Sequence, residues 1–112
     1  MLPKLNRLTK KKDFDIVFRG RKNFRGDFLA LKSVENNLKS SRFGLVVSKK
    51  ISPKAVERNK IKRRLRQIIF SFLKEIKKPT DVVLMALPSI KDKSFIEIKK
   101  ETAKILKKAG VI

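Results

Sequence analysis

The longest regular pattern of apolar positions lies in the middle of the chain. From Ile61 to Ile76, apolar residues recur at intervals of three and four, which places them on one side of an α-helix. Ser52 and Pro53 precede this stripe and are typical of a helix start, because a serine oxygen can accept an unpaired amide hydrogen and proline has none to pair. We therefore predict a long helix that begins near Pro53 and is ended by the segment 77–79.

A shorter helix is predicted on the N-terminal side. Thr9 can cap it, and Gly20 can end it. Phe14, Val17 and Phe18 share one face of this helix at spacings of three and four. We assign Val17 to the core. The shared helix face of the two phenylalanines is compatible with a groove as well as with a core.

The clearest helix start is near the C-terminus. Ser94 and Glu97 have the S-x-x-E spacing of a capping box, in which each side chain bonds to the backbone of the other residue. Gly110 is expected to end this helix. The predicted buried stripe consists of Phe95, Ile98, Thr102, Ile105, Leu106 and Ala109.

Four segments are predicted to be strands. The stretches 27–34 and 43–48 are rich in apolar residues, and the polar segment 35–42 between them predicts a turn that joins them as a hairpin. The stretch 81–87 is almost continuously apolar, which is typical of a strand buried on both faces. A short strand at 21–24 is indicated more weakly.

The predicted elements follow the order α-β-β-β-α-β-α in one domain, residues 1–112. This order indicates an α+β fold. The long helix joins two predicted strands, so it is expected to be a crossover connection, and ordinary chirality would make that crossover right-handed.

The charge of the chain indicates a polyanionic partner. Lys and Arg number 31 against 10 Asp and Glu, which gives a formal net charge of +21. Such an excess repels itself and weakens the compact state, so nucleic acid is the first candidate partner and an anionic membrane the second. The last helix carries five lysines, but its apolar face is needed to cover the sheet, which disfavours the membrane.

Missing residue types exclude several kinds of chemistry. The chain has no Cys and no His, which excludes disulfides and the usual zinc sites and removes the side chain best suited to proton transfer near neutral pH. No apolar run approaches the ~20 residues needed to cross a bilayer, and the basic N-terminus leads into no secretory signal. We expect a cytoplasmic protein with no membrane partner.

The positive charge is densest in residues 48–67, where nine Lys or Arg stand against one acid, Glu57. A solvated helix surface normally mixes both signs of charge, and this one does not, so we favour RNA binding over that alternative. Helical spacing puts Arg58 one turn before the apolar stripe. The candidate RNA-binding residues are Lys49, Lys50, Arg58, Asn59, Lys60, Lys62, Arg63, Arg64 and Arg66.

The motifs S-K-K, A-V and R-N-K-I-K-R-R-L-R-Q within residues 47–67 resemble the signature of the protein subunit of bacterial ribonuclease P. The sequence departs from that signature at Ser52, Pro53 and Lys54, which replace a shorter link that usually contains glycine. The resemblance covers essentially the whole chain. It implies a two-layer α-β sandwich in which the crossover, exceptionally, is left-handed.

The resemblance also implies a function. The partner would be the catalytic RNA of ribonuclease P, and the substrate would be precursor tRNA. The reaction would be the endonucleolytic removal of the 5′ leader. Mg²⁺ would be held chiefly by the RNA, no catalytic residue is expected in this chain, and no obligate protein partner is implied.

Four residues match the family positions that contact the leader, namely Phe14, Phe18, Ser48 and Lys50. A further aromatic position of relatives aligns with Leu31, where stacking on a base is not available.

Two other functions compete with this one. Asp81 and the triplet Glu97-Ile98-Lys99 imitate the metal-binding carboxylates of some nucleases, but Glu97 is better explained by the capping box, and isolated motif matches are often false. A general structured-RNA-binding or ribosomal protein is the stronger alternative, because composition alone does not distinguish one RNA from another.

Overall fold

Four strands form one sheet in the computed structural model, which describes residues 2–112. The strands are β1 (Lys22–Arg25), β2 (Leu29–Glu35), β3 (Arg42–Val46) and β4 (Thr80–Ala86), and their spatial order is β1-β2-β4-β3. β2 pairs antiparallel with β1 and with β4, whereas β3 and β4 are parallel. The strand indicated only weakly by the sequence is thus present as β1.

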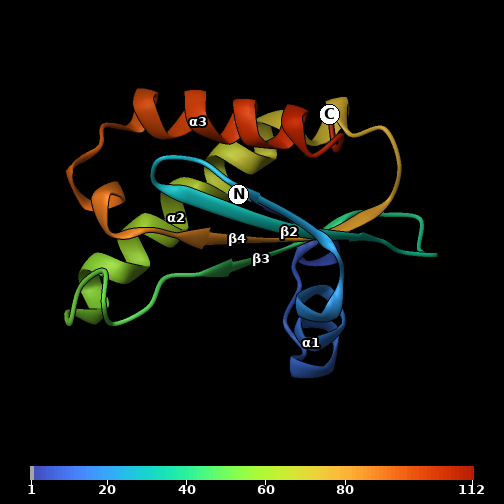
Figure 1. The fold of residues 1–112 in the computed structure, drawn as a ribbon, viewed down its shortest axis with the longest axis horizontal. Coiled ribbons are helices and arrows are strands. Elements are labelled where there is room, and N and C mark those ends of the chain that lie inside the picture. Colours follow the sequence, from blue (N-terminus) through green and yellow to red (C-terminus); the bar gives the residue numbers. More distant parts are fainter. Residues whose placement is uncertain (1) are drawn as a thin grey trace.

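Three helices cover the two faces of this sheet unequally. α2 (Ala55–Phe72) and α3 (Phe95–Lys108) lie over one face, and α1 (Lys11–Arg19) lies on the opposite face (Figure 1). The predicted α+β class, element order and crossover through the long helix are confirmed. The sheet with α2 and α3 forms the predicted sandwich, and α1 adds partial cover to the other face.

The main core fills the space between the sheet and the two long helices. Ile61, Leu65, Ile68 and Ile69 of α2 are buried there, as the periodicity predicted. The strands contribute Leu29, Leu31, Phe43, Val82 and Leu84 to the same core, and α3 contributes Ile98, Ile105 and Leu106. Because each fully buried aliphatic side chain stabilises the fold by about 1.5–3 kcal/mol, this face holds most of the burial energy.

The predicted hairpin between the second and third strands is wrong. β4 lies between β2 and β3 and pairs along its length with both, so that Asp81, for example, stands opposite Val34 on one side and Arg42 on the other. The physical reason is the apolar character of β4, which is buried from Thr80 to Leu84 and is best accommodated in the interior of a sheet. The long polar loop after β2 allows the chain to step past this central strand.

Two predicted helix caps are wrong. The N-cap residue of α1 is Lys10 and not Thr9. The N-cap residue of α2 is Lys54 and not Ser52. The side chains of the two lysines make no cap hydrogen bond. The hydroxyl of Ser52 instead accepts from the backbone N–H of Lys54 (3.2 Å) and donates to Oε2 of Glu57 (2.7 Å). Ser52 therefore stabilises the turn before the helix.

The ends of the helices follow the predictions more closely. α2 stops at Phe72 and continues as a short 3-10 turn, Leu73–Glu75, so the last part of the predicted stripe lies outside the helix. Gly20 ends α1 as expected. Gly110 follows α3 with φ +75°, a conformation that glycine adopts at no steric cost.

The capping box of α3 is confirmed. The backbone N–H of Glu97 donates to Oγ of Ser94 (3.2 Å), and the backbone N–H of Ser94 donates to Oε1 of Glu97 (3.1 Å). The hydrogen bond from the Ser94 backbone to the Glu97 carboxyl group, and after it the one from the Ser94 side chain, lower the pKa of that carboxyl group below its ordinary value of 4.5.

This lowered pKa generates a prediction about acid stability. A carboxylate whose pKa is lowered by folding stabilises the protein above its ordinary pKa, and that contribution is lost as the pH falls through the folded-state pKa. Glu97→Gln keeps an acceptor but removes the charge. We expect the variant to be less stable than the wild type at pH 7, with a difference that shrinks below pH 4.5. Urea unfolding at several pH values measures this, with Glu75→Gln as the control, and a pH-independent difference would contradict it.

Candidate nucleic-acid interface

The basic surface of α2 is not neutralised by carboxylates. Among the described residues, none of the nine Lys and Arg side chains in 48–67 forms an ion pair within 4.0 Å. Glu57, the one acid in this segment, is paired with Lys91 (3.7 Å). Its pKa is lowered, chiefly by the hydrogen bond from the Ser52 hydroxyl and further by Lys91.

Helix geometry distributes the candidate RNA-binding residues around α2. Asn59, Lys60 and Arg63 are exposed, while Lys62, Arg64 and Arg66 are half-buried along the flanks of the buried stripe. Glu57 lies on the same flank as Arg64, and its partner Lys91 belongs to the short turn Pro88–Asp92 that leads toward α3. Lys62 and Arg66 lie on the opposite flank of the buried stripe.

Arg58 has a structural contact that sequence reasoning missed. Its Nη1 donates to the backbone carbonyl of Ser52 at 2.9 Å, and the side chain is half-buried. Arg58 thereby ties the first turn of α2 to the loop before it. No signal in the sequence indicated this contact, because it depends on the path of the loop.

The three residues of the S-K-K motif form an exposed turn between β3 and α2. Ser48, Lys49 and Lys50 are all exposed, and the residues on either side, Val47 and Ile51, are buried. The backbone N–H of Ile51 donates to the carbonyl of Ser48 at 3.0 Å, which closes the turn. The two buried neighbours hold the turn at the end of β3, where it leads directly into the basic helix.

The face of the sheet that carries α1 presents an aromatic pair. The rings of Phe14 and Phe18 are stacked with centroids 6.4 Å apart and an interplanar angle of 27°. Phe14 is half-buried, Phe18 is 39% exposed, and Val17 is fully buried as predicted. Part of an aromatic surface is thus open to solvent.

A glycine in β3 determines where Phe14 lies. A Cβ atom at Gly44 would be 2.5 Å from Cε1 and Cζ of the Phe14 ring, so the ring packs directly on the strand backbone. Around it, Val34, Val46 and Met85 form a small half-buried cluster. The absence of a side chain at Gly44 is therefore what allows α1 to pack closely on β3.

Leu31 lies outside this surface. It is fully buried in the main core, on the face of the sheet covered by α2 and α3. Side chains alternate between the faces of a strand, and it is Lys32 that reaches α1, where its Nζ donates to the carbonyl of Phe18 at 3.4 Å. Lys32 and Met85 are neighbours of the aromatic pair that sequence reasoning missed.

A charged network fixes α1 to the sheet. Arg42 of β3 donates to both carboxylate oxygens of Asp81 (2.9 and 2.6 Å) and to Oδ2 of Asp13 in α1 (3.3 Å). Asn36 adds a bond to Asp81 at 2.7 Å. These contacts, the hydrogen bond to Asp81 first, raise the pKa of Arg42.

The nuclease-like residues are explained by these structural roles. Asp81 belongs to the Arg42 network, and Glu97 belongs to the capping box. Within residues 2–112, no group of three or more Asp or Glu is arranged to hold a metal ion. The structure thus gives no support to a metal site on these residues.

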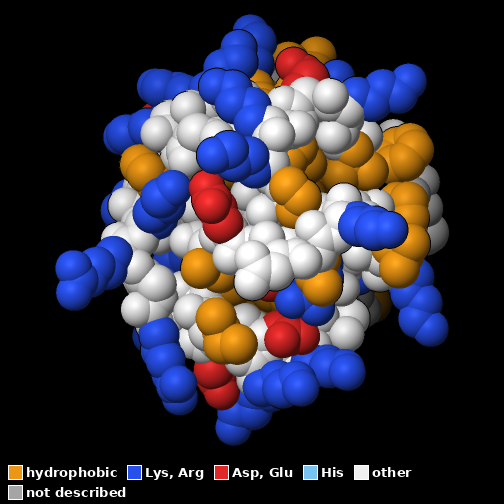
Figure 2. All heavy atoms as spheres, turned by 90° about the vertical axis from the view of Figure 1, so that its right-hand side faces the viewer, with side chains coloured by type: hydrophobic (Ala, Val, Ile, Leu, Met, Phe, Trp, Pro, Cys, Tyr) orange, Lys and Arg blue, Asp and Glu red, His pale blue; other side chains and the backbone are white. Residues whose placement is uncertain are grey.

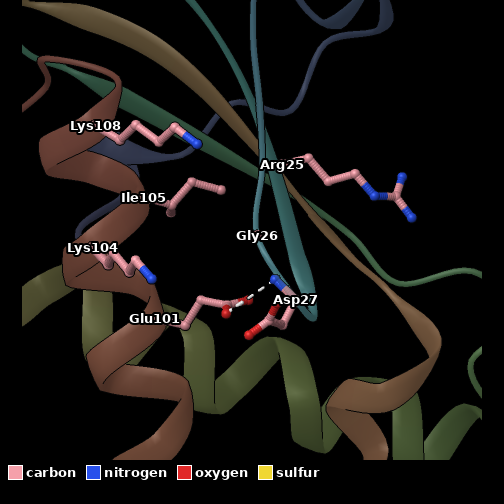
Figure 3. A pocket seen from close by; sticks show the side chains of 7 residues that line it. All are labelled: Arg25, Gly26, Asp27, Glu101, Lys104, Ile105 and Lys108. Carbon is pink, nitrogen blue, oxygen red and sulfur yellow. Dashed lines mark hydrogen bonds between the residues drawn. The ribbon is translucent and has the colours of Figure 1, made fainter.

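A pocket of about 270 Å³ lies between α3 and the β1–β2 turn (Figure 3). Glu101 extends from α3 across it and accepts from the backbone N–H groups of Asp27 (3.2 Å) and Phe28 (2.7 Å). Lys104 and Lys108 also line it, whereas Arg25 points away from α3 (Figure 3). We interpret it as the place where Glu101 holds the turn against the helix.

In the described part of the chain, no helix is both long and apolar enough to cross a membrane.

Comparison with known proteins gives a consistent result. The family model described as Ribonuclease P matches residues 2–110. A "Ribonuclease P protein component" from Syntrophomonas wolfei is 40% identical over 111 residues, which cover 99% of this chain and 92% of the relative.

Solved structures of the same kind have the same fold. A Staphylococcus aureus ribonuclease P protein mutant, described as having defective mRNA degradation activity, superposes with a TM-score of 0.90 at 28% identity and covers 97% of this chain and 92% of its own. The ribonuclease P protein from Thermotoga maritima gives a TM-score of 0.83 at 27% identity, with coverages of 91% and 96%.

The close packing of Phe14 on Gly44 generates a prediction. Gly44→Ala forces the aromatic ring away from β3, and we expect it to lower the free energy of unfolding by about 1–3 kcal/mol, the usual cost of overpacking. In a Phe14→Ala background the ring is absent, so the same change should cost much less. A double-mutant cycle by urea denaturation measures the coupling. If Gly44→Ala lowers the free energy of unfolding equally in both backgrounds, the position of the Phe14 ring does not depend on Gly44.

Proposed function

Because the chain belongs to the ribonuclease P protein family, we propose that it is the protein subunit of a ribonuclease P holoenzyme. In this role it binds the catalytic RNA and the 5′ leader of precursor tRNA and assists the removal of that leader. The observation that carries the proposal is the basic surface of α2 and the S-K-K turn, where nine cations have no carboxylate within ion-pairing distance among the described residues.

The basic surface supplies the RNA affinity in this proposal. Each cation that contacts a phosphate releases condensed counterions, which favours binding and makes it depend on salt. Arg63 on the exposed side of α2 and Arg66 on its flank are suited to phosphate contacts, because guanidinium groups stay charged and bind phosphate through two parallel hydrogen bonds. Arg58 contributes mainly by holding the start of the helix, since its guanidinium already bonds to Ser52.

The α1 face supplies the leader-binding surface. Phe14 and Phe18 present stacked rings, and every nucleobase has a face on which an aromatic ring can stack, so such a surface tolerates different leader sequences. Ser48 and Lys50 lie on the exposed turn after β3, the strand on which Phe14 packs. Lys32, bonded to the backbone of Phe18, adds a positive charge beside the aromatic pair.

The chemistry of cleavage is assigned to the RNA. In this proposal Mg²⁺ is held chiefly by RNA, and the protein screens the repulsion between two polyanions and positions the leader. Asp81 and Glu97 do not suit a resident metal, since both are engaged in structural hydrogen bonds. The proposed site of action is the cytoplasm.

The first functional prediction concerns salt dependence. Replacing Arg63 and Arg66 together with alanine should reduce the slope of log affinity against log salt by about 0.7–0.9 for each phosphate that the protein no longer neutralises. The control Lys99→Ala/Lys100→Ala removes the same charge from α3 and should change the slope less. Binding to the catalytic RNA is measured at several salt concentrations, with circular dichroism as the folding check. An unchanged slope in the arginine variant would place the RNA site elsewhere.

The second functional prediction concerns the exposed aromatic ring. Phe18→Ala removes the ring that stacks on a leader base, so it should weaken binding of precursor tRNA by about 1–3 kcal/mol and have little effect on mature tRNA. Phe70→Ala removes another half-exposed ring from α2 and serves as the control. Equal losses of affinity for precursor and mature tRNA, or a collapse of the melting temperature, would return Phe18 to a purely structural role.

A further inference from the structure

We infer that an open pocket at the end of the sheet where β3 and β4 begin is a phosphate-binding site, which contacts RNA independently of the basic surface of α2. The inference rests on the proposed RNA-binding function but concerns a different part of the molecule. The pocket has a volume of about 320 Å³ and lies where the segment before α1, the β2–β3 loop and the connection from α2 to β4 meet. It is lined by Asn6, Lys39, Ser40, Ser41, Leu73, Ile76, Lys77, Lys78 and Pro79.

The lining of this pocket carries charge of one sign. Lys39, Lys77 and Lys78 contribute three ammonium groups, and no acidic residue lines the pocket. None of the three lysines forms an ion pair within 4.0 Å in the part of the chain that the structure describes. The pocket in Figure 3, in contrast, contains two carboxylates, Asp27 and Glu101. Three like charges around one hollow repel one another, and a bound anion would relieve that repulsion.

The polar residues of the pocket suit an oxyanion. Ser40 and Asn6 lie beside the three lysines, and a hydroxyl group and the second N–H of the Asn6 amide, whose first bonds to Ser41, are common donors to phosphate oxygens. Glu35 lines a neighbouring pocket together with Lys77 and Lys78, and it stands within 4.0 Å of neither ammonium group. The carboxylate of Glu35 therefore does not occupy the position that a bound anion would take beside Lys77 and Lys78.

The walls of the pocket are held by hydrogen bonds, one of which is buried. Ser41 is only 6% exposed, and its Oγ accepts from the backbone N–H of Thr80 at 2.9 Å. The side-chain amide of Asn6 donates to the carbonyl of Ser41 at 2.8 Å, and the backbone N–H of Lys77 donates to the carbonyl of Val111 at 3.0 Å. The first two bonds join the three segments that form the pocket, and the third ties one of them to the C-terminal segment, so little ordering is required when an anion binds.

The pocket is remote from the start of α2. Lys54 precedes the helix and Leu73, which lines the pocket, follows it, so the two are separated by the helix length of about 27 Å. Figure 2 looks onto the end of the molecule that lies on the right in Figure 1 and includes the β2–β3 loop, and Lys and Arg side chains surround this face. An RNA that contacts both places would reach along most of the long axis of a protein whose extent is 36 Å.

The test compares three variants of the full chain in which the change of charge is controlled. The pocket variant is Lys39→Ala/Lys77→Ala/Lys78→Ala, and the matched control, Lys99→Ala/Lys100→Ala/Lys107→Ala, removes the same charge from exposed positions of α3. A third variant changes the three pocket lysines to arginine and keeps the charge. Affinity for the catalytic RNA is measured against salt, and the shift of the melting temperature with inorganic pyrophosphate is measured without RNA.

We expect the pocket variant to lose about 2–3 units of the salt slope if all three lysines contact phosphates, and the arginine variant to keep the slope. The decrease should add to that of the Arg63→Ala/Arg66→Ala variant, because the two sites act separately. An equal decrease in the α3 control would mean a general charge effect and would overturn the inference. The pocket variant could instead lose the shift of the melting temperature with pyrophosphate while its RNA affinity keeps the wild-type salt slope. That result would mean that the pocket binds a free anion and does not contact RNA, and it would overturn the inference. Failure of the Arg63→Ala/Arg66→Ala variant alone to change the slope would instead count against the proposed use of α2.

Discussion

The small number of carboxylates, and their use in contacts within the fold, is the constraint on which the rest of the structure depends. Of the 10 acidic residues, five are held in contacts that stabilise the fold, and they are Asp13, Glu57, Asp81, Glu97 and Glu101. Three of these accept hydrogen bonds mainly from hydroxyl or backbone groups, so much of their capacity does not pair with lysine or arginine. The chain thereby keeps a stable structure while most of its 31 cations remain available to a polyanion.

The two faces of the sheet differ in the helices that cover them and in the residues that they hold in place. The face under α2 and α3 holds the main core and gives the basic helix a rigid support. The opposite face is covered only in part by α1, which is attached through Arg42 and through the packing of Phe14 on Gly44. Because β3 carries both Arg42 and Gly44 and continues into the S-K-K turn, one strand positions the aromatic pair and the start of the basic segment together.

The sequence predicted what depends on local pattern and missed what depends on tertiary contacts. The capping box at Ser94 is complete within four residues, and the burial of β4 follows from its apolar run, so both could be predicted. The position of β4 between β2 and β3 could not, because the strongest local signal was the polar loop between those two strands. The neighbours of the aromatic pair could not be predicted either, because the bond from Lys32 to the backbone of Phe18 depends on how α1 packs on the sheet.

The central position of β4 has a consequence for synthesis on the ribosome. β2 and β3 have no hydrogen bonds to each other in the finished sheet, and both pair with a strand that ends at Ala86 of 112 residues. Until that segment has left the exit tunnel, the apolar stripe of α2 has no completed sheet to cover, and β3 has no strand to pair with. Folding of the sheet therefore waits for β4, which is made only after the strongly cationic helix α2.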